Sequence, residues 1–182
     1  SSNSQASQKI TSSESTVAAD PCVAGEALDN FELAMRDDIW QRMRKGFAIE
    51  AIKHDKIAKK VAWHKRNPHH IAIIAERSRP YLHHILEQLD EQDLPYEIAL
   101  IPMIESGFDP FAYSPVTASG LWQFMPYTGK HMGLEQNWWY DGRRDVAAST
   151  EAALNYLKKR HKQFDNNWLL ALAAYNGGQG NV

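Results

Sequence analysis

The sequence predicts a mainly α-helical fold in a single domain. Three observations support this prediction. Apolar residues recur at the three- and four-residue spacing of amphipathic helices over most of the chain after residue 28. No stretch shows the alternation of apolar and polar residues that is typical of a strand. At 182 residues the chain has the size of one ordinary domain and can bury a sizeable core.

The N-terminal half contains a polar leader and three helical patterns. Residues 1–25 carry almost no large apolar group, so we expect a disordered leader. The spacing then predicts one helix over residues 29–46 and a second over 48–67, whose basic residues face solvent. A long third helix should occupy residues 68–90, and Pro80 inside it predicts a kink or a break.

A single acid, Glu105, ends the next apolar run. Asp93 is expected to cap this helix, with Pro95 in its first turn. Ile98, Ile101 and Glu105 are spaced i, i+3, i+7, which places the carboxyl on the same face as isoleucines directed to the core. Because an apolar environment disfavours the charged form, the pKa of Glu105 should be raised, and the group can stay protonated near neutral pH.

The C-terminal half alternates loops and helices. Turn residues dominate positions 106–119 and predict an ordered loop, followed by a short helix over 118–126. Residues 145–164 show the strongest helical pattern. Residues 168–175 form a second, almost continuously apolar helix, which should therefore be buried on most sides. It should stop at Asn-Gly-Gly, residues 176–178.

Composition limits the classes of partner. The chain has 20 Lys and Arg against 22 Asp and Glu, so no electrostatic reason exists to expect nucleic acid or an anionic membrane. Six Trp and seven Tyr suit the apolar faces of sugar rings, although large aromatic residues serve a core equally well. The single Cys22 excludes an intrachain disulfide. The His residues lack the spacing of a metal site, so we predict no metal and no cofactor.

One protonated carboxyl is the minimum for cleaving a glycosidic bond, and Glu105 can supply it. Most glycosidases add a second carboxylate. The candidates here are Asp109, Asp141, Asp145 and Glu151. Asp109 precedes a proline in a turn, which accounts for this residue structurally. Asp141, Asp145 and Glu151 lie around the start of the long helix, where the helix dipole favours acidic residues. A mechanism with one acid therefore has to be considered beside one with two carboxylates.

Four motifs resemble the catalytic domain of the family 1 lytic transglycosylases, which have a goose-type lysozyme fold. They are Glu105-Ser106 with Phe108-Asp109-Pro110, then Ser114-Pro115, then residues 118–126, and finally residues 174–178. Residues 140–146 and 164–170 are similar to one membrane-bound subgroup in particular. The likeness is strong from about residue 95 to 180, weaker from 31 to 93, and absent from the leader.

The resemblance implies that the chain cleaves the β-1,4 bond between N-acetylmuramic acid and N-acetylglucosamine in peptidoglycan without water. The product would carry a 1,6-anhydro ring. Glu105 would protonate the leaving oxygen and then accept the proton of the C6 hydroxyl, while the substrate's own 2-acetamido group assists. By the same matching, the groove is lined by Ser114, Gln123, Met125, Tyr175 and Asn176, and Ser106 holds the acid. A core position for Met125 and a helix terminus at Tyr175-Asn176 remain open alternatives.

The resemblance also implies an organisation and a location. Residues 26–92 would form a helical segment packed on a lysozyme-like catalytic core, residues 93–182. The core stops soon after the Ala-Tyr-Asn motif, so we expect it to be truncated and its activity reduced. A monomer acting on peptidoglycan strands in the periplasm is implied, with outer-membrane association only through an anchor upstream. The alternatives are a lysozyme-like hydrolase and a catalytically silent or weakened peptidoglycan-binding fragment.

Overall fold

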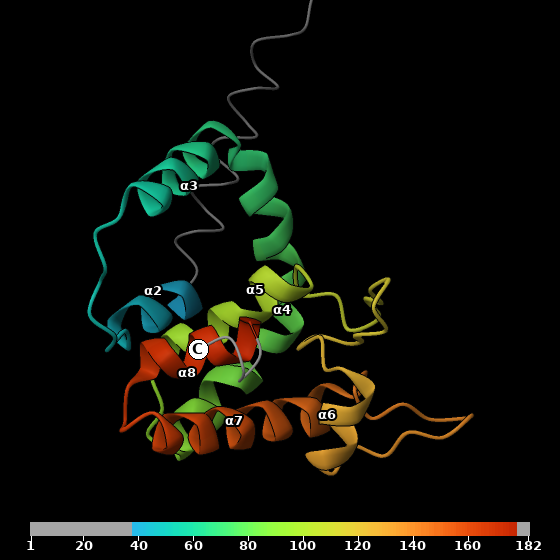
Figure 1. Ribbon diagram of the computed structural model, residues 1–182. Coiled ribbons are helices and arrows are strands. Elements are labelled where there is room, and N and C mark those ends of the chain that lie inside the picture. The colour runs from blue at the N-terminus through green and yellow to red at the C-terminus, as the bar shows by residue number, and fades with distance from the viewer. Residues whose placement is uncertain (1–37, 178–182) are drawn as a thin grey trace, which may run out of the picture.

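A computed structural model describes residues 38–177, and its regular elements are helices (Figure 1). In order, they are α2 (Asp38–Lys45), α3 (Asp55–Arg66), α4 (Pro68–Glu91), the 3-10 helix η1 (Tyr96–Leu100), α5 (Ile101–Glu105), α6 (Pro126–His131), α7 (Val146–Gln163) and α8 (Trp168–Gly177). Within this part of the chain there is no strand, only isolated β-bridges. The mainly α prediction is confirmed. The predicted leader, residues 1–25, lies outside the described residues.

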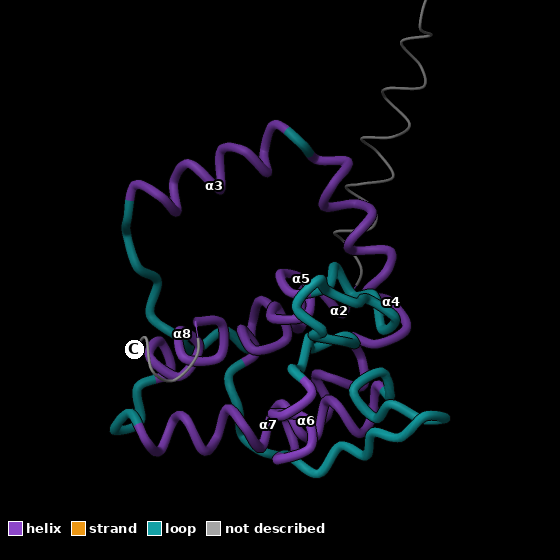
Figure 2. The backbone as a smooth tube through the Cα atoms, turned by 45° about the vertical axis from the view of Figure 1, so that its right-hand side comes forward, coloured by secondary structure: helices purple, strands orange, loops and turns teal. Residues whose placement is uncertain are grey.

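Long loops connect α5 to α6 and α6 to α7, and they gather on one side of the helices (Figure 2). The predicted ordered loop over residues 106–119 is confirmed, since it consists of turns and bends with backbone hydrogen bonds. The predicted helix over 118–126 is wrong. Gly120 and Gln123 adopt positive φ angles of 84° and 50°, and Ser119 forms a bridge with Phe124, so the chain turns back on itself and a helix begins only at Pro126.

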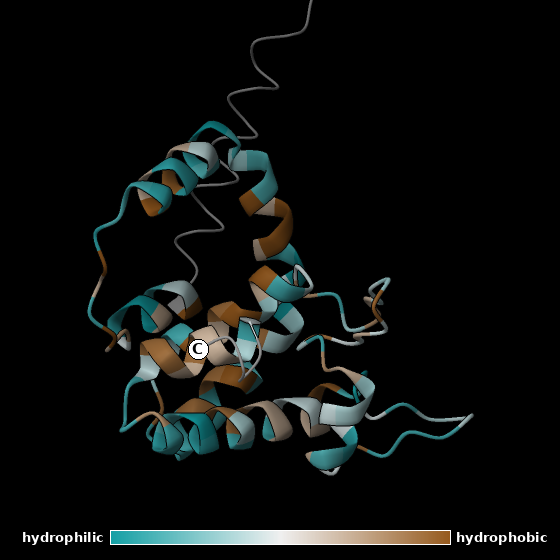
Figure 3. Cartoon of the chain, viewed as in Figure 1, coloured by the Kyte–Doolittle hydropathy of each residue, from teal (hydrophilic) through white to brown (hydrophobic). Residues whose placement is uncertain are grey.

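The helix α3 has no buried residue and lies apart from α7 and α8, packed on the N-terminal part of α4 (Figures 1 and 3). Its basic residues are exposed, as predicted. It begins at Asp55 rather than at Ala48, because the His54 side chain accepts the Lys56 N–H and caps the helix there. In α4, Pro80 lies inside a continuous helix, so the predicted alternative of a break is wrong.

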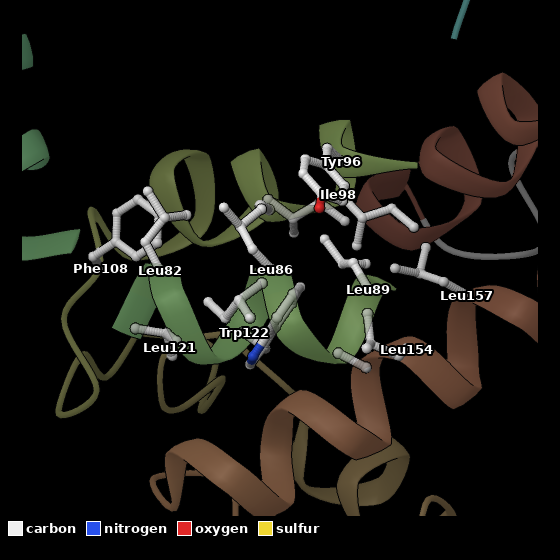
Figure 4. Close-up of a cluster of buried hydrophobic side chains, with 14 of the residues drawn as sticks. Leu82, Leu86, Leu89, Tyr96, Ile98, Phe108, Leu121, Trp122, Leu154 and Leu157 are labelled. Carbon is white, nitrogen blue, oxygen red and sulfur yellow. The ribbon is translucent and has the colours of Figure 1, made fainter. Parts of the chain in front are cut away.

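The core lies where the C-terminal half of α4 meets η1, α5 and α7 (Figure 4). Leu82, Leu86 and Leu89 occupy one face of α4 at spacings of four and three residues and are fully buried. Figure 4 shows Leu89 beside Leu154 and Leu157 of α7 and Leu82 beside Phe108 at the other end of the cluster. Burial of each such side chain contributes about 1.5–3 kcal/mol to the stability of the folded state. The helix α4 is therefore a fixed support for the short helix α5, which carries Glu105.

Two details of the predicted helices are corrected. Asp93 does not cap a helix. It has φ 51°, its N–H donates to the Asp90 carbonyl at the end of α4, and the next helical residues form the 3-10 helix after Pro95. Helix α8 is not buried on most sides, because it packs on α7 and the core through one face, which includes Ala171 and Ala174. The other side leaves Leu169 and Leu170 38% and 41% exposed.

Candidate active site

Glu105 is the last residue of α5 and lines a cleft of about 640 Å³. The cleft has two walls. The α4 wall consists of His70, Ile73, Ile74 and Arg77. The loop wall belongs to the segment 106–124 and includes Ser106, Tyr113, Ser114 and Gln123. Four of the predicted site residues, Glu105, Ser106, Ser114 and Gln123, are therefore brought together in one cleft.

Burial raises the pKa of Glu105 above its usual value. This agrees with the expectation from the apolar face, since Ile98 and Ile101 are buried. The pKa of Tyr175 is raised well above its usual value, first by burial and then by the charge of Glu105, so the two groups lie within electrostatic reach of each other. Among the described residues that line this cleft, Glu105 carries the one carboxyl. The described part of the cleft therefore offers one carboxyl that can act as an acid and no second carboxylate beside it.

The other candidate acids lie outside the cleft, and three of them have structural partners. Asp109 accepts the Phe111 N–H at 2.9 Å in a turn. Asp145 caps α7 by accepting the Ala148 N–H at 2.9 Å. Asp141 binds the Arg143 guanidinium, which lowers the pKa of that carboxyl. Glu151 is exposed on α7.

Gln123 and Ser114 present polar atoms to the cleft from the loop wall. The Gln123 amide nitrogen donates to the carbonyls of Gly120 (2.9 Å) and Ala112 (3.2 Å), which leaves its carbonyl oxygen as the acceptor for a ligand. The Ser114 hydroxyl oxygen accepts the Ala118 N–H at 3.0 Å, so its proton remains available to donate. Gln123 holds a positive φ of 50°, a strained backbone state that occurs preferentially at functional sites.

Two hydroxyl groups connect the loop wall to helices. Ser106 Oγ lies 2.8 Å from the Leu121 carbonyl and 3.1 Å from the Pro102 carbonyl, so its proton links the turn after Glu105 to the loop. The Tyr175 hydroxyl donates to the Trp122 carbonyl at 2.7 Å. Helix α8 is therefore bound to the loop next to Gln123.

Met125 and Asn176 are placed differently from the other predicted site residues. Met125 is 42% exposed and precedes α6, so the alternative that it belongs to the core is wrong. Asn176 is exposed within α8, which extends through Gly177 in the described part of the chain. Met125 and Asn176 do not line the cleft that contains Glu105, and neither does Tyr175, which contacts the loop wall through the Trp122 carbonyl instead.

Sequence reasoning missed the contribution of Arg143, which is 6% exposed. Its guanidinium binds Asp141 through two contacts of 2.9 and 2.7 Å, and it also donates to the carbonyls of Thr117 (2.7 Å) and Phe124 (3.0 Å). It thereby joins two points of the loop wall that are seven residues apart in sequence. The motif around Arg143 was visible in the sequence, but nothing local indicated which carbonyls it would bind.

The α4 wall was also missed. His70 and Arg77 are exposed residues of a helix, and their spacing alone suggests only a solvated surface. The packing of α4 beside α5 brings both to the cleft that contains Glu105. Arg77 places a guanidinium, a fixed positive charge, on this wall.

Neither a metal centre nor a membrane span is found in the described part of the chain. Between residues 38 and 177, no three His, Cys, Asp or Glu side chains are grouped so that they could hold a metal ion. The helices in that range are too short or too polar to cross a bilayer.

Comparison with known proteins gives a family match. The family described as Transglycosylase SLT domain matches residues 85–182. The chain is 39% identical over 154 residues to the membrane-bound lytic murein transglycosylase D of Escherichia coli (strain K12), which covers 85% of this chain and 34% of that protein. It is 48% identical over 106 residues to a putative tributyltin chloride resistance protein of Alteromonas sp. (strain M-1), covering 58% of this chain and 51% of that protein.

A more distant match extends over half of the chain. The soluble lytic murein transglycosylase of Escherichia coli (strain K12) is 35% identical over 96 residues, which cover 50% of this chain and 15% of that protein. The chain thus spans only 34% to 51% of the length of the first two of these relatives. The similarity includes Glu105 and the whole loop wall, since the family match begins at residue 85.

Proposed function

The chain belongs to the transglycosylase SLT domain family, which matches 98 of its 182 residues, and we propose that it is a lytic transglycosylase of peptidoglycan. The lysozyme-like helical fold predicted from the motifs is the fold of this family. The proposed reaction is non-hydrolytic cleavage of the β-1,4 bond between N-acetylmuramic acid and N-acetylglucosamine. One observation carries the proposal: among the described residues that line the cleft, Glu105 has the one carboxyl, and burial raises its pKa.

In the proposed mechanism a single carboxyl acts twice. Protonated Glu105 donates its proton to the glycosidic oxygen as the bond from that oxygen to C1 of the muramic acid breaks. The substrate's 2-acetamido group stabilises the positive charge that develops at C1. The C6 hydroxyl oxygen then bonds to C1, and its proton passes to the Glu105 carboxylate. Glu105 is restored, no water is consumed, and the products are a free 4-hydroxyl and a 1,6-anhydro ring.

The residues around Glu105 are proposed to hold the acid and to bind the sugar. Ser106 fixes the turn that carries the acid through its bond to the Leu121 carbonyl. The Gln123 carbonyl oxygen and the Ser114 hydroxyl bind substrate groups from the loop wall. Tyr175 keeps α8 against the loop and shields the acid. Met125 and Asn176, both exposed, would contact only glycan that extends beyond this cleft.

The cellular location that we propose follows from the proposed substrate. Peptidoglycan strands lie in the bacterial cell envelope, so we place the protein in the periplasm, acting as a monomer. The names of two relatives mark one as membrane-bound and one as soluble, and the association of this chain with the outer membrane is proposed only through a segment upstream. Neither nucleic acid nor a metal ion is part of the proposal.

The test is Glu105→Gln, assayed on purified peptidoglycan strands. Because general acid catalysis contributes about 10²–10⁴-fold, we expect turnover to fall by about that factor while glycan binding is kept. Glu151→Gln is the matched control, since it removes an exposed carboxyl of α7 outside the cleft, and it should keep the turnover of the original chain. Substantial turnover in Glu105→Gln would refute Glu105 as the acid.

Product masses separate the proposal from its alternatives. Lytic transglycosylation gives muramic ends that lack the mass of one water, whereas a lysozyme-like hydrolase gives ends that include it. Binding of strands without any product would indicate a peptidoglycan-binding fragment. Products that carry the added water would overturn the non-hydrolytic reaction but would leave Glu105 as the proton donor.

The raised pKa of Glu105 also predicts a pH dependence. Turnover should fall as pH rises through this pKa, because the proton is then lost before reaction. The raised pKa of Glu105 also makes the free energy of unfolding depend on pH. The native state favours the protonated form of Glu105, so its contribution to stability is complete below the ordinary pKa of glutamic acid. This contribution is lost as pH rises through the pKa of the folded state. The melting temperature of Glu105→Gln relative to the original chain should therefore be higher at about pH 8 than at about pH 4.

A further inference from the structure

Two adjacent tryptophans, Trp138 and Trp139, stand exposed on the loop between α6 and α7. Their exposed fractions are 78% and 77%, and their indole planes meet at 33°. They line a second hollow of about 440 Å³, distinct from the cleft that contains Glu105. Since large aromatic side chains gain free energy when buried, an exposed pair beside a hollow is a candidate surface for binding a ligand.

Hydrogen bonds hold this loop in a defined shape. The Asn137 side-chain oxygen accepts the N–H groups of Trp139 (2.9 Å) and Tyr140 (2.8 Å), and the Asn137 N–H donates to the Tyr140 carbonyl at 2.9 Å. The Tyr140 hydroxyl donates to Asp145, the cap of α7, at 3.1 Å. The tryptophans are thus presented by an ordered turn, which lowers the entropic cost of binding.

One side-chain contact connects the lining of the hollow with the lining of the Glu105 cleft. Arg144 lines the hollow, and its guanidinium lies 5.9 Å from the centre of the Tyr113 ring. Tyr113 in turn lines the cleft. The Arg144 side chain also donates to Ser119 Oγ at 3.1 Å, which ties it to the loop wall. Figure 2 shows the two loops on the same side of the molecule.

We propose that the hollow beside Trp138 and Trp139 is an outer subsite for a strand of β-1,4-linked N-acetylhexosamines whose reacting bond lies in the Glu105 cleft. This inference rests on the proposed function. Indole faces pack against the apolar faces of pyranose rings, and the charged side chains at the rim bind hydroxyl and acetamido groups. A strand long enough to reach both hollows is therefore held at two points.

Charge favours a neutral sugar over other ligands. One arginine, Arg144, and two aspartates, Asp141 and Asp145, line the hollow, so its formal charge is not positive. An anionic polymer or an anionic lipid surface calls for an excess of Lys and Arg, which this surface lacks. The neutral rings and amides of the glycan strand match both the aromatic faces and the mixed polar rim.

The experiment compares the dissociation constants of chitotriose and chitohexaose, which are β-1,4-linked N-acetylglucosamine oligomers, by calorimetry on the full chain. The original chain should bind the hexamer about tenfold more tightly than the trimer, because an additional stacked contact contributes about that factor. In the double variant Trp138→Ala/Trp139→Ala the ratio should fall to about one. Trp138→Phe/Trp139→Phe keeps a flat ring at each position and should restore most of the preference.

Tyr127→Ala is the matched control, because Tyr127 is 82% exposed on α6 but lines neither hollow. It should keep the tenfold ratio. Equal hexamer-to-trimer ratios in the original chain and the double alanine variant would overturn the inference, as would binding of vesicles that depends on the two tryptophans without any hexamer preference. The proposed function fails separately, through hydrated products or an active Glu105→Gln variant, and neither result depends on these ratios.

Discussion

The two walls of the Glu105 cleft are built in different ways. The loop wall has little regular structure, yet Arg143 and Tyr175 bind it from other segments, and Ser106 bonds within it to the Leu121 carbonyl. The α4 wall is regular helix, yet it continues into α3, which has no buried residue. In this site the wall without regular secondary structure therefore has more tertiary hydrogen bonds than the helical wall.

This difference suggests how the site works. The polar atoms of Ser114 and Gln123 belong to the supported loop wall, and the proposed acid lies directly before it at the end of α5, where small displacements would lower the rate of catalysis. The opposite wall presents His70, Ile73 and Arg77 from a helix segment with fewer buried neighbours. Regions with few buried contacts open with lower free energy, so we expect the N-terminal part of α4 to move more readily than the loop wall.

The strongest test of the comparison is Arg143→Met. The change leaves Asp141 as an unpaired carboxylate and removes the donor to two loop carbonyls. Breaking a buried ion pair in this way costs about 3–5 kcal/mol, measured as the free energy of unfolding in denaturant. The control on the other side is Arg79→Met, because Arg79 forms an exposed ion pair with Glu76 on α4. Arg79→Met should lower the free energy of unfolding by less than about 1 kcal/mol. Equal losses in Arg143→Met and Arg79→Met would contradict the difference between the two walls.

Substitutions at two glycines form a matched pair whose expected effect on stability is intermediate. Gly120 and Gly133 have similar positive φ angles of 84° and 87°. A Cβ at Gly120 would lie 1.7 Å from the Arg143 carbonyl oxygen, whereas a Cβ at Gly133 would meet nothing within 4 Å. Gly133→Ala should cost about 1–2 kcal/mol for the backbone conformation alone. Gly120→Ala should cost about 1–3 kcal/mol more, and the absence of any difference in thermal unfolding would show that the loop wall relaxes freely.

The smallest effect is expected in α3. Val61 is 47% exposed, so Val61→Ala should change the free energy of unfolding by less than about 0.5 kcal/mol. Leu154→Ala in α7, where the side chain is fully buried, should cost about 2–5 kcal/mol in the same measurement. If Val61→Ala costs more than about 1 kcal/mol, α3 is packed against another surface in solution and the contrast between the walls is weaker.

Local patterns predicted the helices well and their ends less well. Asp145 was expected to start α7, and it does so by capping Ala148. The expected helix over residues 118–126 failed because its composition is compatible with a helix, whereas the contacts of Gly120 with Arg143 and of Ser119 with Phe124 favour a turn. Such contacts involve residues distant in sequence and cannot be read from a local window.

The amino-acid sequence by itself determined the helical fold class and an acid on an apolar face, because both depend on periodicity and polarity within one segment. It also supplied the motifs that marked the family. Only the tertiary structure decided which acids lie outside the cleft, which carbonyls Arg143 binds, and that Trp138 and Trp139 are left uncovered. The physical reason is that these features depend on how separate segments pack. Tyr175 and the carbonyl it binds are 53 residues apart, a distance over which sequence spacing carries no geometric information.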